Sequence, residues 1–307
     1  MAVIEAKLVA ELRKQTGCGM MDCKNALVAA NGDFDAAVKV LREKGMAATA
    51  KKQSRIAAEG LVDILTVGNK TAMIEVNTET DFVAKNASFK EFVQGVLRTI
   101  LACEPADVDA LKACKFDGTA ETVEQVLQEK TYTIGEKLSL RRFIVVEGTV
   151  STYVHGTGVT GVIVKFDTDV ADKPEFAEFS KNIALQVAAY NVPYLDRASV
   201  PASVLDEEKE ILKKQMAQDP KMANKPEKVL EGIITGKLGK YYENNCLLEM
   251  LYVKDDSITV GKYVEQTAKA LGGKIAVTGF YRYDKGEGIQ KREDDLAAEV
   301  AKLTGQA

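Results

Sequence analysis

The 307-residue chain has only one histidine, an odd number of cysteines and no long hydrophobic run. With His155 alone, it cannot assemble a metal site from several imidazoles, and its five irregularly spaced cysteines include no pair of CxxC elements. A catalytic histidine normally needs an orienting partner, so acid–base chemistry at this residue is not favoured. These shortages predict a protein without a zinc site, with reduced thiols.

Long apolar segments and an excess of one charge are also missing. No stretch approaches the roughly 18 apolar residues of a membrane span, and the first residues lack the charged-then-apolar order of a signal peptide. The 41 basic and 45 acidic residues give a net charge of -4, which provides no overall attraction for nucleic acid or an anionic membrane. We therefore expect a cytoplasmic protein with no membrane and no direct nucleic-acid partner.

Sequence signatures of common catalytic sites are absent as well. The chain contains no GxxxxGKS/T phosphate loop, no GxGxxG after a strand, no HExxH and no GxSxG. Carboxylates are abundant, but none accompanies a credible base or nucleophile. Binding without covalent chemistry and without a cofactor is the predicted activity, and an enzyme with an unrecognised active site remains an alternative.

What is present is a globular composition, 46% hydrophobic and 28% charged, long enough for two or three domains. Apolar spacing predicts three short helices in residues 2–45, closed by Gly45, and then a helical or flexible linker over residues 46–58. Strands are predicted at residues 61–67 and 72–76, and a helix at about 88–102. The linker is basic, which we interpret as a solvated face; nucleic-acid binding through it is the alternative.

An internal repeat begins where the strands begin. Glu59-Gly60 matches Glu147-Gly148 at an offset of 88, and Thr80-Asp81 matches Thr168-Asp169 at the same offset. Beyond this point the offset is 87, so we predict that the second copy lacks one residue, opposite Phe82. A residue that one copy omits is less needed for the fold, which favours Phe82 as a partner contact over a buried anchor.

Met21 is a second candidate contact. If Cys23, Ala26 and Leu27 define the buried face of the second helix, Met21 falls opposite that face and Met20 at its edge. Methionine suits an adaptable interface, although a first-turn methionine folded back over the bundle explains the pattern equally well.

Residues 201–251 read as an antiparallel helical hairpin with many charges of both signs. It either pairs with another copy of the chain or packs on its own core. A helix at 260–271 and a strand at 275–283 follow; the strand is expected to complete the sheet of the second copy, with Val277, Tyr281 and Tyr283 on one face. Leu296, Val300 and Leu303 indicate a terminal amphipathic helix.

Several separated segments resemble the bacterial elongation factor Ts family. They are Leu12 to Lys24, Asn31-Gly32-Asp33, Thr80 to Lys85, His155-Gly156, and Phe280 with Gly286-Glu287-Gly288. They occur in the family's order and cover essentially the whole chain. The chain departs from the family pattern at Cys18, where alanine is usual, and at Met250-Leu251, where a Gln-Pro pair is common.

The resemblance implies an α+β fold with five parts. These are a three-helix ubiquitin-associated-like domain (1–54), a duplicated antiparallel-sheet-plus-helix core (55–140, and 141–200 with 252–284), an inserted helical-hairpin dimerisation region (201–251) and a C-terminal helical module (285–307).

The resemblance also implies a guanine nucleotide exchange factor for the GTPase elongation factor Tu. Thr80, Asp81, Phe82 and Val83 match the segment that wedges into the GTPase near its magnesium ion. Leu12, Met20, Met21 and His155 match further contact positions, and the hairpin matches a homodimer contact. A generic adaptor that needs only residues 1–45 is a competing hypothesis.

Overall fold

The computed structural model describes residues 4–219 and 225–290, and mixes helices with small antiparallel sheets, as expected for an α+β fold. The chain forms two compact units. Unit 1 comprises Met1–Val145, Gly156–Thr160 and Tyr283–Ala307, and unit 2 comprises Val146–His155 and Gly161–Arg282. Each unit has its own hydrophobic core.

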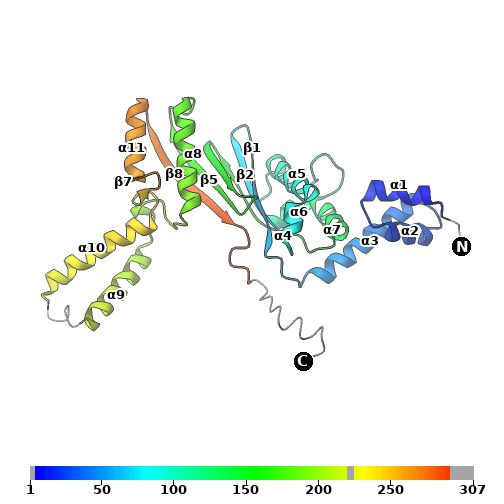
Figure 1. The fold of residues 1–307 in the computed structure, drawn as a ribbon, viewed down its shortest axis with the longest axis horizontal. Coiled ribbons are helices and arrows are strands. Elements are labelled where there is room, and N and C mark those ends of the chain that lie inside the picture. Colours follow the sequence, from blue (N-terminus) through cyan, green and yellow to red (C-terminus); the bar gives the residue numbers. More distant parts are fainter. Residues whose placement is uncertain (1–3, 220–224, 291–307) are drawn as a thin grey trace. The chain divides into compact units, whose positions relative to one another are not determined.

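Unit 1 begins with the predicted three-helix bundle (Figure 1), formed by α1 (Ala6–Thr16), α2 (Met20–Ala29) and α3 (Phe34–Lys52). Leu12, Cys23 and Leu27 are fully buried in it. The prediction that Gly45 closes the bundle is wrong, because α3 continues to Lys52. A Cβ at Gly45 would lie 3.7 Å from the Gln128 carbonyl oxygen, an ordinary contact distance, so this position packs against a neighbouring helix without requiring glycine.

A three-stranded sheet of order β1-β2-β3 forms the rest of the unit 1 framework. Its strands are β1 (Glu59–Val67), β2 (Lys70–Thr78) and β3 (Ser139–Glu147). β1 and β2 pair antiparallel, from Glu59 with Thr78 to Val67 with Lys70, around the predicted turn at residues 68–69. Helices α4 (Asp81–Lys85), α5 (Ala87–Cys103), α6 (Val108–Ala113) and α7 (Val123–Ile134) follow β2. Phe89 and Phe92 of α5 anchor the core against the sheet.

The repeat is visible in the order of elements: β1, β2 and α5 correspond to β4 (Thr149–His155), β5 (Thr160–Thr168) and α8 (Pro174–Ala189). Its matched glycines share a left-handed backbone, with φ of 123° at Gly60 and 103° at Gly148. The connection that carries Phe82 is longer than its counterpart, as predicted. Residues 79–86 connect β2 with α5, whereas only residues 169–173 connect β5 with α8, and α4 lies in the longer connection.

Unit 2 contains a sheet of order β4-β5-β8, which confirms that β8 (Ile275–Asp284) completes the second sheet. The helices α8 and α11 (Val260–Leu271), with the short strands β6 (Leu251–Tyr252) and β7 (Asp255–Thr259), complete this unit. The prediction that Val277, Tyr281 and Tyr283 share one face of β8 is wrong. Val277 is buried, but Tyr281 is exposed and Phe280 packs on the core, so the buried face changes near Gly279, where a strand bends easily.

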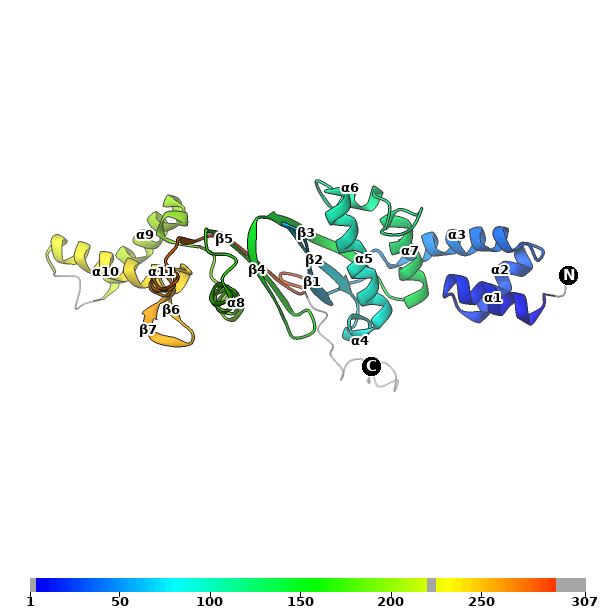
Figure 2. The same cartoon turned by 90° about the horizontal axis from the view of Figure 1, so that it is seen from above.

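The predicted hairpin consists of α9 (Ala202–Gln218) and α10 (Glu227–Asn245), which lie side by side (Figure 2). A short helical turn, η1 (Arg197–Ser199), precedes it. Leu212 and Met216 of α9 are buried, whereas α10 contains no buried residue. If the hairpin packs on its own core, this core therefore involves mainly α9. Pairing of the hairpin with a second copy of the chain stays a prediction. The predicted terminal helix at Leu296, Val300 and Leu303 lies outside the described residues.

Candidate functional site

The turn after β2 places an aromatic side chain in solvent. Phe82, in the five-residue helix α4, is 81% exposed. Its neighbours Val83 and Ala84 turn inward: Ala84 is buried and Val83 is partly buried against the unit 1 core. Of the four predicted wedge residues, Phe82 therefore projects most strongly, while Val83 helps to hold the helix on the protein.

Two carboxylates fix the residues that lead into α4. The backbone N–H and the hydroxyl of Thr80 donate to Glu136 at 2.9 and 2.6 Å. The Glu79 carboxylate accepts the Lys137 N–H at 2.6 Å and a longer bond from Arg55. Glu136 lies 56 positions from Thr80, and no local pattern in the sequence connects the two residues.

Asp81 adds an ionised group beside the exposed ring. Its carboxylate accepts a hydrogen bond from Lys85 at 2.6 Å, one helical turn later, and this contact lowers the pKa of Asp81. About half of the Asp81 side chain is exposed. The turn thus presents a large apolar side chain next to a half-exposed carboxylate that is paired with Lys85.

The predicted contact positions of the bundle separate into exposed and buried groups. Met20 and Met21, at the start of α2, are 57% and 62% exposed, which confirms the exposure predicted for Met21. Leu12 is fully buried in the bundle core, so its expected role as a contact is corrected: no surface of its side chain is accessible. His155, the last residue of β4 in unit 2, is exposed, and its Nδ1 lies 3.0 Å from the Tyr153 hydroxyl.

A buried acidic residue lies at the centre of β2. The Glu75 side chain has no exposed surface and accepts hydrogen bonds from Arg141 (2.8 Å), Arg142 (2.7 Å), the Gly286 N–H (2.8 Å) and Asn77 (3.1 Å). Burial raises its pKa, but these four donors outweigh burial and leave the pKa of Glu75 below its usual value. The contacts join β2, β3 and the turn after β8 within unit 1.

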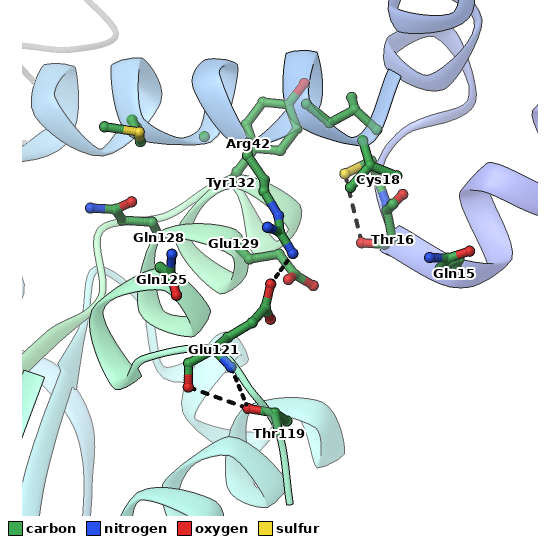
Figure 3. Close-up of a pocket in the computed structure, with 14 residues that line it drawn as sticks. Gln15, Thr16, Cys18, Arg42, Thr119, Glu121, Gln125, Gln128, Glu129 and Tyr132 are labelled. Carbon is green, nitrogen blue, oxygen red and sulfur yellow. Dashed lines mark hydrogen bonds and ion pairs between the residues drawn. The ribbon is translucent and has the colours of Figure 1, made fainter. Parts of the chain in front are cut away.

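Unit 1 also contains a pocket of about 420 Å³ between α3, α7 and the α1–α2 connection (Figure 3). Arg42 crosses it and pairs with Glu121, while burial, with the nearby Glu121 charge, raises the pKa of Glu129. Burial also raises the pKa of the Cys18 thiol, the one thiol among the lining residues, so it is protonated and unreactive. The pocket therefore offers no activated nucleophile.

The two departures from the family pattern are accommodated by packing. Cys18 is 3% exposed and belongs to the bundle core, where its small side chain lies near Thr16. Met250 belongs to the core of unit 2, and Leu251 begins β6. Neither departure disturbs the turn that carries Phe82.

Over residues 4–219 and 225–290, no group of three or more His, Cys, Asp or Glu side chains is placed to hold a metal ion. None of the helices in this part of the chain is both long and apolar enough to span a membrane. The exposed turn at Asp81-Phe82 and the exposed methionines of α2 remain the principal candidates for function.

Comparison with known proteins shows the family of the chain. A family model described as "Elongation factor TS" matches residues 79–287. The chain is 46% identical over 304 residues to an elongation factor Ts of Syntrophotalea carbinolica, with 98% of this chain and 99% of that protein covered. It is 43% identical to one of Clostridium kluyveri (98% of each chain) and 42% identical to one of Rhodospirillum centenum (99% and 100%). The chain belongs to the elongation factor Ts family of translation elongation factors.

Proposed function

We propose that the protein is a guanine nucleotide exchange factor that binds elongation factor Tu with GDP and promotes GDP release, so that GTP can bind. The observation that supports this proposal best is the exposed Phe82 beside the Asp81 carboxylate, on a turn held by hydrogen bonds. The identity of the partner, elongation factor Tu, is inferred from membership of the family. The proposed activity requires no covalent chemistry by this chain.

The physical basis of exchange is linkage between two ligands of the GTPase. A GTPase holds its nucleotide through backbone N–H groups and a bridging Mg²⁺. A protein that binds the nucleotide-free form more tightly must weaken nucleotide binding by the same factor. In the proposed mechanism, Phe82 is buried between elements of the GTPase and Asp81 disturbs the surroundings of the magnesium ion. Thr80 and Val83 hold this pair in place.

The direct test uses elongation factor Tu loaded with fluorescently labelled GDP. Addition of the full chain with excess unlabelled nucleotide should accelerate loss of the label, and the rate should saturate as the concentration of the chain rises. A release rate equal to the spontaneous rate at every concentration would refute the proposal. An excess of residues 1–45 alone should not accelerate release, because this fragment lacks Phe82. If this fragment binds the partner about as well as the full chain, the adaptor hypothesis is favoured.

We propose that Met20 and Met21 dock on the GTPase, with His155 as a further contact. Met21→Asp should weaken the complex by roughly tenfold or more, because a charge would enter a desolvated interface. The melting temperature should hardly change, since Met21 is exposed. Titration calorimetry and thermal unfolding measure the two effects.

A matched control for this variant is Met46→Asp, because Met46 is a methionine of α3 with 57% exposure. Its substitution introduces the same charge away from the start of α2, and binding should be retained. Equal loss of affinity in both variants would mean that the added charge acts at long range and that Met21 makes no specific contact.

A further inference from the structure

The threonine that precedes α4 differs from other threonines at helix starts in this chain. Thr122 and Thr259 accept a backbone N–H with their hydroxyls, from Gln125 at 3.3 Å and Lys262 at 3.2 Å, and so cap α7 and α11. Thr80 occupies the same position in α4 but makes no such cap. Its hydroxyl donates to Glu136 instead. A local helix-stabilising bond is thus replaced by a bond to a distant segment.

The bond to Glu136 belongs to a reciprocal set of contacts, which we call the latch: Glu79, Thr80, Glu136 and Lys137. Glu136 accepts both donors of Thr80, and Glu79 accepts the Lys137 N–H. The Lys137 ammonium also donates to the carbonyl oxygens of Gln53 and Arg55, at 2.7 and 2.8 Å. Two consecutive residues before α4, Glu79 and Thr80, are therefore joined to two consecutive residues of the distant segment, Glu136 and Lys137. This double connection fixes both the position and the direction of the chain that enters α4.

A helix as short as α4 cannot maintain its own geometry. One turn of helix is unstable in isolation, because nucleation fixes several residues for a single hydrogen bond. Phe82 contributes almost no packing, since it is 81% exposed, so only Val83 and Ala84 attach the helix through apolar contact. Hydrogen bonds to a carboxylate are among the stronger ones in proteins. The latch, together with the Thr78 hydroxyl, which donates to the Thr80 carbonyl oxygen at 2.7 Å, is a polar attachment that lies just before Phe82.

We propose that Glu136 is a positioning residue that orients α4 and thereby the direction in which Phe82 projects. This part of the inference concerns the free protein and does not depend on any partner. Its consequence for nucleotide exchange rests on the function proposed above. Glu136 itself is expected to touch neither the GTPase nor its nucleotide.

The first test measures how firmly α4 is held in one orientation in the free protein. The chain has no tryptophan, so Phe82→Trp creates a single tryptophan on α4, which can be excited selectively over the tyrosines. In this background, Glu136→Ala should lower the residual fluorescence anisotropy of the tryptophan by roughly a third, the difference between a rigid and a flexible segment. Glu91→Ala removes an exposed carboxylate from α5 and should leave the anisotropy unchanged. Unchanged anisotropy in Glu136→Ala would overturn the proposal.

The second test separates orientation from general stability. In the GDP-release assay, Glu136→Ala should lower the maximal rate by about tenfold, as expected when bonds to one charged group are lost. The concentration that gives half of this rate should change less, because Met20 and Met21 are unaffected. In the Phe82→Ala background, Glu136→Ala should cause a much smaller additional loss, because only the contribution of Asp81 on α4 is then left to displace. A purely structural role would give additive losses in the double variant and would refute the proposal.

A variant that perturbs less of the fold provides an independent test. Thr80→Val removes only the hydroxyl bond and keeps the shape of the side chain, and it should give a smaller loss in the same direction in both assays. If Phe82→Ala exchanges at the full rate, the proposed wedge role of Phe82 fails but the anisotropy result stands, and if the natural chain does not accelerate release at all, the proposed function fails. If Phe82→Ala is slow while Glu136→Ala is not, only the role of Glu136 is refuted.

Discussion

Replacing Phe82 with alanine is expected to slow GDP release from elongation factor Tu by roughly tenfold to a hundredfold. Burial of a phenylalanine side chain contributes about 1.5–3 kcal/mol, and each 1.4 kcal/mol corresponds to a factor of about ten. In the free protein Phe82 is 81% exposed, so this energy is not used for folding. It is gained only in the complex, and there it favours the form of the GTPase that has lost its nucleotide.

The measurement is the saturating rate of labelled-GDP release, together with thermal unfolding of the free variant. Val67→Ala is a suitable control, because Val67 is also apolar, exposed (59%) and part of unit 1. It should exchange at the normal rate. Normal exchange by Phe82→Ala would remove the wedge from the mechanism, and a large fall in its melting temperature would show that Phe82 supports the fold.

The second large effect concerns stability and is expected for Glu75→Gln. The variant leaves Arg141 and Arg142 opposite a neutral amide at a fully buried position. Removal of one partner from a buried ion pair typically costs about 3–5 kcal/mol. We expect a loss near the lower limit, about 3 kcal/mol, because both arginines are partly exposed and become hydrated. The unfolding midpoint of unit 1 should fall by roughly 6–12 °C.

The same variant should change the pH dependence of stability. Because the pKa of Glu75 is lower in the folded than in the unfolded protein, its contribution is fully present above the unfolded pKa of about 4.3. This contribution is lost as the pH falls through the folded pKa. The stability difference between the natural protein and Glu75→Gln should therefore be constant near neutral pH and shrink on acidification below about 4.3.

Calorimetry from neutral to acidic pH measures this difference. Asp109→Asn is the control, because Asp109 forms only an exposed pair with Lys112 and should change stability by less than about 0.5 kcal/mol. A stability difference for Glu75→Gln that grows on acidification would show that burial, and not the four donors, dominates the pKa of Glu75.

Local patterns were sufficient to predict much of the fold. Helical spacing predicted the bundle and the exposure of Met21, and strand alternation predicted β1, β2 and the position of β8. The duplicated glycines marked the repeat, and their shared left-handed backbone explains why glycine occurs at both positions. These features depend on neighbours within a few residues, so a short stretch of sequence is enough to predict each of them.

Features that depend on distant residues were missed. Glu75 and Arg141 are 66 positions apart, and a carboxylate in a strand is usually expected to face solvent. Glu136 acts on Thr80 across 56 positions. The helix α4 is too short to show periodicity, and Gly45 resembled a helix end because its packing partner lies on α7. In each case, tertiary contacts override the local signal.

The contact between the Gly286 N–H and Glu75 has a consequence for deletion experiments on the C-terminal module. A protein shortened to residue 284 would lose this backbone donor as well as Glu287, which pairs with Arg142. Its defects would then combine loss of the module with damage to a buried charge in the sheet. A protein that ends at residue 290 keeps both contacts, so the difference between the two lengths separates the effect of deleting residues 291–307 from damage to unit 1.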